Sequence, residues 1–89
     1  MKHSELVGLS DKELSKLAPE ATHQHFKGGL YKYLGPLMDA DTGVQMERNG
    51  FPIVCYLHLF PHERQTWARV APEFFGDKNG QPRFRKLLA

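Results

Sequence analysis

The side chains best suited to bind a ligand are Trp67 and Arg69, which alternate along a short segment. Alternate side chains of an extended strand lie on the same face, so the indole and the guanidinium would be neighbours. A guanidinium can stack on an indole, and such a pair can hold an anion or a planar base. In a chain of 89 residues, a tryptophan more often belongs to the core. The sequence leaves both interpretations of Trp67 open.

More rings and cations accompany this pair. Arg83 and Arg85 also alternate, so they would share one face of a last strand. Proteins that bind single-stranded nucleic acids interleave aromatic rings and positive charge in this way. The other rings are supplied by Tyr31, Tyr33, Tyr56, Phe74, Phe75 and Phe84.

Five histidines and one cysteine raise the question of a metal site. His23 and His25 alternate and would share a strand face, whereas Pro61 interrupts any helix that would carry both His58 and His62. A zinc site needs a second cysteine pair or a tight histidine pair, and the sequence has neither. We therefore expect no metal and no cofactor.

Residues 53–60 are the best strand candidate because they are rich in β-branched and aromatic residues. Alternation gives one face to Ile53, Cys55, Leu57 and Leu59, and the other to Val54, Tyr56, His58 and Phe60. The first face is wholly apolar, so we expect it to be buried, with Cys55 as a core thiol. Cys55 and His58 then point apart and cannot form a nucleophile–base pair. We predict no catalytic residue.

A short helix should precede the strands. Ser10 and Glu13 have the spacing of a capping box, and Leu9 and Leu14 stand at the positions of a hydrophobic staple. Pro19 ends the helical pattern. The helix is too short to be stable alone, so it must pack against the rest of the chain.

Turn signals divide the remainder of the chain at intervals of about ten residues. The glycine pair at 28–29 indicates a bulge or tight bend, and Asn49-Gly50 is a strong hairpin signal. Further turns are expected at 39–43 and 76–80, and a shorter strand at 66–70. This spacing predicts a small antiparallel barrel or sandwich.

Composition sets broad limits on function. A chain of 89 residues makes one domain with one modest core, and its hydrophobic and charged fractions are those of a globular protein. The net charge of +2 divides into −2 over residues 1–63 and +4 over residues 64–89. One cysteine cannot form an intramolecular disulfide, and no apolar stretch is long enough for a signal peptide or a membrane span. We expect a cytoplasmic protein with no membrane contact.

Several motifs follow one another in a recognisable order. The segment His25–Tyr31 reads HFKGGLY, residues 67–69 read WAR, and Arg83-Phe84 follows Gly80. Together with Asp41-Thr42-Gly43 and the strand at 54–56, they resemble the family of small bacterial proteins called domain of unknown function 1653. The resemblance covers residues 25–87, and it departs from the family pattern at Val70, where a proline is expected.

The resemblance implies an SH3-like barrel over residues 23–89, preceded by a helical extension at 1–22. The family has no established activity, so no function follows from it. It does imply a shared surface, whose candidate binding residues are His25, Lys27, Tyr31, Thr42, Trp67, Arg69, Arg83 and Phe84.

Three functions remain open at this point. The first is a non-catalytic module, monomeric or homodimeric, that binds a protein or peptide, since small barrels have aromatic grooves suited to extended segments. The second is a nucleic-acid binder, which the positive last third of the chain favours. The third is an enzyme or binder for a small polar ligand, which needs His25 or His58 beside a carboxylate.

Overall fold

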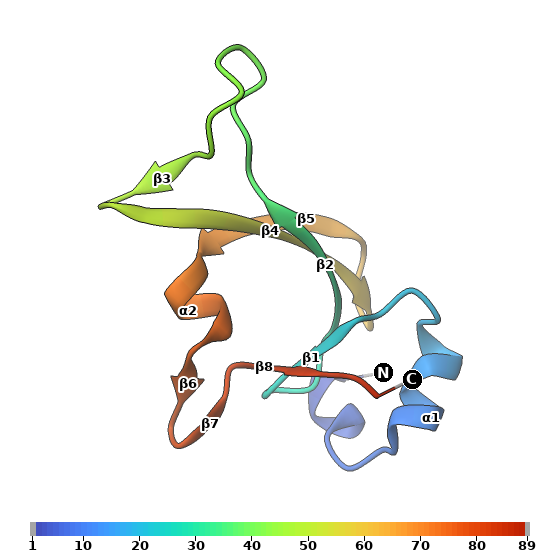
Figure 1. The fold of residues 1–89 in the computed structure, drawn as a ribbon. Coiled ribbons are helices and arrows are strands. Elements are labelled where there is room, and N and C mark those ends of the chain that lie inside the picture. The colour runs from blue at the N-terminus through green and yellow to red at the C-terminus, as the bar shows by residue number, and fades with distance from the viewer. Residues whose placement is uncertain (1, 89) are drawn as a thin grey trace.

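A strongly curved antiparallel sheet dominates the computed structural model, which describes residues 2–88 (Figure 1). The strands are β1 (His23–His25), β2 (Leu30–Pro36), β3 (Glu47–Arg48), β4 (Phe51–Phe60), β5 (Gln65–Val70), β6 (Asp77–Lys78), β7 (Gln81–Pro82) and β8 (Phe84–Lys86). The helical elements are η1 (His3–Leu6), α1 (Asp11–Leu17) and α2 (Ala71–Phe75).

The order of the strands leaves the sheet open. It runs β3-β4-β2-β1-β8, β5 pairs with β4, and β6 and β7 form a separate hairpin. The predicted mainly β, antiparallel fold is confirmed. The expected barrel is not closed, because within residues 2–88 no pairing joins β5 to β8.

The N-terminal helix begins as the sequence predicts. The Ser10 hydroxyl accepts a hydrogen bond from the Glu13 amide at 3.1 Å, and the Glu13 carboxylate accepts one from the Ser10 amide at 3.2 Å. Leu14 is fully buried, and Leu9 packs against the same cluster. The capping box and the staple are therefore both confirmed.

Replacing the cap should weaken the fold measurably. Ser10→Ala leaves the Glu13 amide without its acceptor, so we expect a loss of about 1 kcal/mol in the free energy of unfolding. Urea denaturation measures this loss. Ser15→Ala is the control, because the Ser15 hydroxyl only donates to the Lys12 carbonyl within the helix. Equal stability of the two variants would contradict this role of the cap.

Two tight hairpins also follow the prediction. Asn49 and Gly50 join β3 to β4 with φ values of 53° and 80°. Asn79 and Gly80 join β6 to β7 with φ values of 54° and 79°. Both turns thus use the left-handed backbone region that asparagine and glycine tolerate. The short helices η1 and α2 were not predicted.

The core consists of two clusters of buried side chains. One joins the N-terminal region to the sheet and the C-terminus, through Leu6, Leu14, Ala18, Leu30 and Leu87. The other lies inside the curve of the sheet, where Val54, Tyr56, Phe74 and Phe84 pack together. The helical extension therefore shares its core with the strands.

Apart from Ile53, the buried residues of β4 lie on the face opposite to the one predicted. Val54, Tyr56 and His58 are at most 5% exposed, whereas Cys55 is only half-buried. Strand alternation holds, but the interior of the sheet is filled with rings, and Tyr56 and His58 join them. The prediction that Cys55 is a buried core thiol is wrong for this reason.

The connection from β2 to β3 projects from the body of the protein as an arm (Figure 1). A turn organised by Asp39 ends this arm, since its carboxylate accepts from the Asp41 and Thr42 amides at 2.8 and 3.2 Å. Residues 40–51 are exposed throughout. The arm therefore adds little to either core cluster.

Candidate functional site

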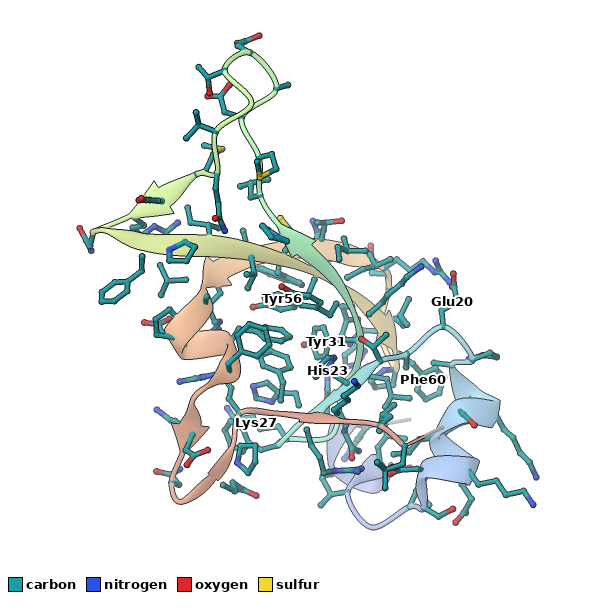
Figure 2. All side chains as sticks on the ribbon, in the orientation of Figure 1. Glu20, His23, Lys27, Tyr31, Tyr56 and Phe60 are labelled. Carbon is teal, nitrogen blue, oxygen red and sulfur yellow. The ribbon has the colours of Figure 1, made fainter. Side chains whose placement is uncertain are left out.

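A cleft of about 220 Å³ opens on the concave side of the sheet. We call it the aromatic–arginine cleft. Its lining residues come from five strands and are His25, Tyr31, Tyr56, Trp67, Arg69 and Phe84. Figure 2 shows two of them, Tyr31 and Tyr56, on the inner side of the curved sheet. The lining holds a guanidinium and five rings, and it includes no carboxylate.

Strand register and ring packing hold this lining in place. Tyr56 and Trp67 are direct partners across β4 and β5. Tyr31 meets Tyr56 and Phe84 edge to face, with ring centroids 5.5 and 5.4 Å apart. Such edge-to-face contacts are favourable, so the inner rings fix one another. Trp67 is 52% exposed and forms the outer wall of the cleft, so it is not a core residue.

Arg69 is oriented by two neighbours. Its Nε donates to the Tyr56 hydroxyl at 3.1 Å, and a terminal nitrogen lies 3.8 Å from a Glu73 carboxylate oxygen. The Glu73 contact is a long one from an exposed side chain, so it neutralises Arg69 weakly. A guanidinium has five N–H donors, and these contacts leave donors for a ligand.

His25 is a neutral hydrogen-bond donor. Its Nδ1 accepts from the Lys27 amide at 3.1 Å, so the neutral ring carries its proton on Nε2. Burial, followed by the positive charges of Arg83 and Arg69, lowers the pKa of His25 to about 4. Burial also raises the pKa of Tyr31, which keeps its hydroxyl protonated. The cleft therefore presents donors and positive charge at neutral pH.

The low pKa of His25 predicts a pH-dependent stability. The unfolded chain, with a histidine pKa of about 6.5, takes up the proton more readily than the folded chain. This contribution to stability is complete above about pH 6.5 and is lost as the pH falls toward about 4. Urea unfolding at pH 7.5 and pH 5 should show a larger loss for the wild type than for His25→Gln. An identical loss in both proteins would argue against this account.

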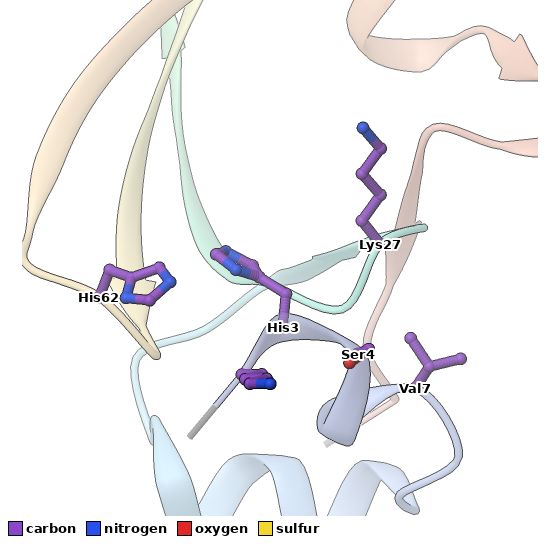
Figure 3. A pocket seen from close by; sticks show the side chains of 6 residues that line it. His3, Ser4, Val7, Lys27 and His62 are labelled. Atoms are coloured by element: carbon purple, nitrogen blue, oxygen red, sulfur yellow. The ribbon is translucent and has the colours of Figure 1, made fainter.

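The structure brings together five of the eight residues proposed from the sequence, namely His25, Tyr31, Trp67, Arg69 and Phe84. Arg83 adjoins them, because its charge lowers the pKa of His25. Lys27 also acts on His25, but it lines a neighbouring cleft (Figure 3). Thr42 lies apart from the cleft, in the arm, where its hydroxyl accepts from the Val44 amide at 3.2 Å.

Sequence reasoning missed Tyr56 and a second cleft. Strand alternation correctly placed Tyr56 on the same face as His58. That face was predicted to point outward, so Tyr56 was not proposed as a site residue. The second cleft, of about 320 Å³, shares Tyr31 and Trp67 with the first and also contains His3, His58, His62, Glu63 and Gln65. A third, wider cleft adjoins it through His3 and His62, and Figure 3 shows the His3 ring directed toward His62. The second cleft shares lining residues with each of the other two, so the three clefts adjoin one another.

Three of the histidine rings lie near one another. The centroid of the His3 ring lies 5.6 Å from that of His58 and 4.7 Å from that of His62. Within residues 2–88, however, no group of three or more His, Cys, Asp or Glu side chains is arranged to hold a metal ion. His58 uses Nδ1 to contact the main-chain carbonyl of Glu63 at 3.1 Å, and a carbonyl only accepts, so Nδ1 carries the proton.

No helix within residues 2–88 has the length and apolar character needed to cross a membrane. No curated protein and no solved structure matches the chain. The model of one family, described as a protein of unknown function (DUF1653), matches residues 21–86. That match includes every strand and the whole aromatic–arginine cleft. The chain therefore belongs to the DUF1653 family.

Proposed function

We propose that the chain is a non-catalytic binding module of the cytoplasm that recognises an acidic side chain within an extended peptide segment of a partner protein. The aromatic–arginine cleft is the binding site. The observation that carries this proposal is the lining of the cleft, which combines donors and a guanidinium with rings and has no carboxylate.

The cleft suits a carboxylate for three reasons. Arg69 can donate from its terminal nitrogens, and His25 has a protonated Nε2. Lys27 and Arg83 add positive charge close enough to lower the pKa of His25. Trp67 supplies an exposed apolar wall against which the methylene groups of a ligand can pack.

A nucleic acid fits this surface less well. Single-stranded nucleic acids need ring faces that are free for stacking. Here Phe84 packs edge to face against both Tyr31 and His25, whereas Trp67 is 52% exposed and is the ring most open to stacking. The cleft lining contains a single cation, Arg69, and Arg85 is held by Asp11 at 2.9 Å. A phosphate backbone is bound through several cations, so this cleft offers too few of them.

The test uses the fluorescence of Trp67, the single tryptophan of the chain. The probes are the capped peptide Ac-Thr-Val-Glu-Val-Thr-NH2 and two analogues with glutamine or lysine at the centre. A charge-assisted hydrogen bond is worth about 1.5–3 kcal/mol, so the glutamate peptide should bind about 10- to 100-fold more tightly than the glutamine peptide. The lysine peptide should bind most weakly.

Two protein variants and one oligonucleotide complete the experiment. Arg69→Gln should abolish the preference for glutamate, while Arg48→Gln, an exposed arginine of β3, should preserve it. Absence of binding by all three peptides at about 1 mM would refute the proposal. Tighter binding of a thymidine decamer, with an affinity that falls steeply with salt, would establish the nucleic-acid alternative instead.

A further inference from the structure

The outer edge of β5 has no strand beside it. β5 pairs along its length with β4, from Ile53–Val70 to His58–Gln65. On its other side, no strand within residues 2–88 is paired with it. Such an edge presents a row of unpaired backbone N–H and C=O groups, which can pair with an extended segment of another chain.

β5 also lacks most of the features that usually protect an edge strand. Natural edges are protected by charged side chains, lysine above all, and by proline, bulges or a covering element. β5 contains no lysine or proline, its register with β4 has no irregularity, and its only charged residue, Arg69, belongs to the cleft lining. The other edge of the sheet, β8, is protected, since it carries Arg85 and Lys86 and is tied to α1 through the Arg85–Asp11 ion pair. Of these two edges, β5 is therefore the less protected.

Three side chains of β5 line the clefts beside this edge. Gln65, Trp67 and Arg69 alternate along the strand and line the second cleft and the aromatic–arginine cleft. A segment paired with β5 would place every second side chain on the same side as these residues, about 7 Å apart. One such side chain would lie beside Arg69, the next beside Trp67 and the third beside Gln65.

We propose that β5 receives an extended segment of a partner protein as an added strand, with an acidic side chain of that segment held in the aromatic–arginine cleft. This inference rests on the proposed function and states how the peptide is bound. Main-chain hydrogen bonds to β5 supply affinity, and the cleft supplies the preference for an acidic residue. Charge complementarity identifies the partner, because the cleft lining contains Arg69 and no carboxylate, and Arg83 and Lys27 lie near enough to act on His25.

Backbone methylation of the probe tests strand addition. In a strand, the amides of alternate residues point toward the same neighbour. Five versions of Ac-Thr-Val-Glu-Val-Thr-NH2, each N-methylated at one residue, should therefore fall into two groups. Methylation at one set of alternate residues should weaken binding about tenfold, since it removes a hydrogen bond and introduces a clash. Methylation at the intervening residues should change the affinity less than about threefold.

Hydrogen exchange on the full-length protein provides the second measurement. In the free chain, alternate amides of residues 65–70 should exchange rapidly, and addition of the unmodified peptide should protect them. The amides of β8 serve as the internal control and should not change.

The outcomes separate the two proposals. If the glutamate peptide binds through Arg69 but methylation shows no alternation, strand addition is wrong and the binding function stands. If no peptide binds, both proposals fall. If alternate amides of β5 become protected as the concentration of the chain alone is raised, the edge is occupied by a second copy, and the proposed partner is wrong.

Discussion

Phe74→Ala should lower the free energy of unfolding by about 3–5 kcal/mol, the range measured for buried phenylalanines elsewhere. Phe74 is 0% exposed and lies at the centre of the cluster inside the sheet. Its ring stacks on the Phe84 ring, with centroids 4.3 Å apart, and its centroid lies 5.1 Å from that of the Tyr56 ring. Deleting the ring leaves a cavity beneath both residues. Urea denaturation of the two proteins measures the loss.

The neighbouring Phe75 is a matched control on the same helix. It is 60% exposed, so Phe75→Ala should cost less than about 1 kcal/mol. Phe74→Ala should also weaken peptide binding, because Phe84 lines the cleft and loses its stacking partner. A loss of stability below about 1.5 kcal/mol for Phe74→Ala would show that this cluster is not the principal core.

Gly28→Ala should be nearly as damaging, for a different reason. A Cβ atom at residue 28 would lie 1.8 Å from the main-chain oxygen of His3, and φ at this glycine is +118°. The N-terminal segment must then move away from the turn between β1 and β2. Leu6 would leave its fully buried position, and its carbonyl would lose the hydrogen bond from Gln24 Nε2 at 3.1 Å. We expect a loss of about 3–5 kcal/mol in all.

Gly35→Ala is the control that distinguishes backbone strain from a steric clash with His3. Gly35 has a similar φ of +114°, but a Cβ atom there would meet nothing within 4 Å. Gly35→Ala should therefore lower the free energy of unfolding only by the strain of the unfavourable backbone conformation, about 1–3 kcal/mol. In hydrogen exchange, Gly28→Ala should expose the amides of residues 3–9 and Gly35→Ala should not. Equal effects of the two substitutions would contradict the docking of the N-terminal segment on Gly28.

Local signals predicted the local structure of the chain. The capping box at Ser10 and the hairpin at Asn49-Gly50 each depend on two to four adjacent residues, so the local sequence is enough to predict both. The strand over 53–60 followed from its composition in the same way. The sharing of one face by His23 and His25 is also confirmed, since their rings contact Phe74 and Phe84.

Features that depend on distant residues were not predictable. The inward face of β4 depends on rings from β2, α2 and β8, and a polar-looking pair such as Tyr56 and His58 is buried only because those rings surround it. Trp67 is half exposed because the sheet does not close beside β5. The close approach of His3 to Gly28 joins segments 25 residues apart in sequence, and nothing local indicates it.

The most direct test of the binding site is its position on the protein. In a nuclear magnetic resonance titration with Ac-Thr-Val-Glu-Val-Thr-NH2, the signals of the Trp67 indole N–H, the Arg69 guanidinium and His25 should move together and saturate. The peptide with glutamine in place of glutamate should move the Arg69 signal much less. Shifts confined to the arm at residues 37–46, with the Trp67 and Arg69 signals unchanged, would contradict the assignment of the aromatic–arginine cleft as the binding site.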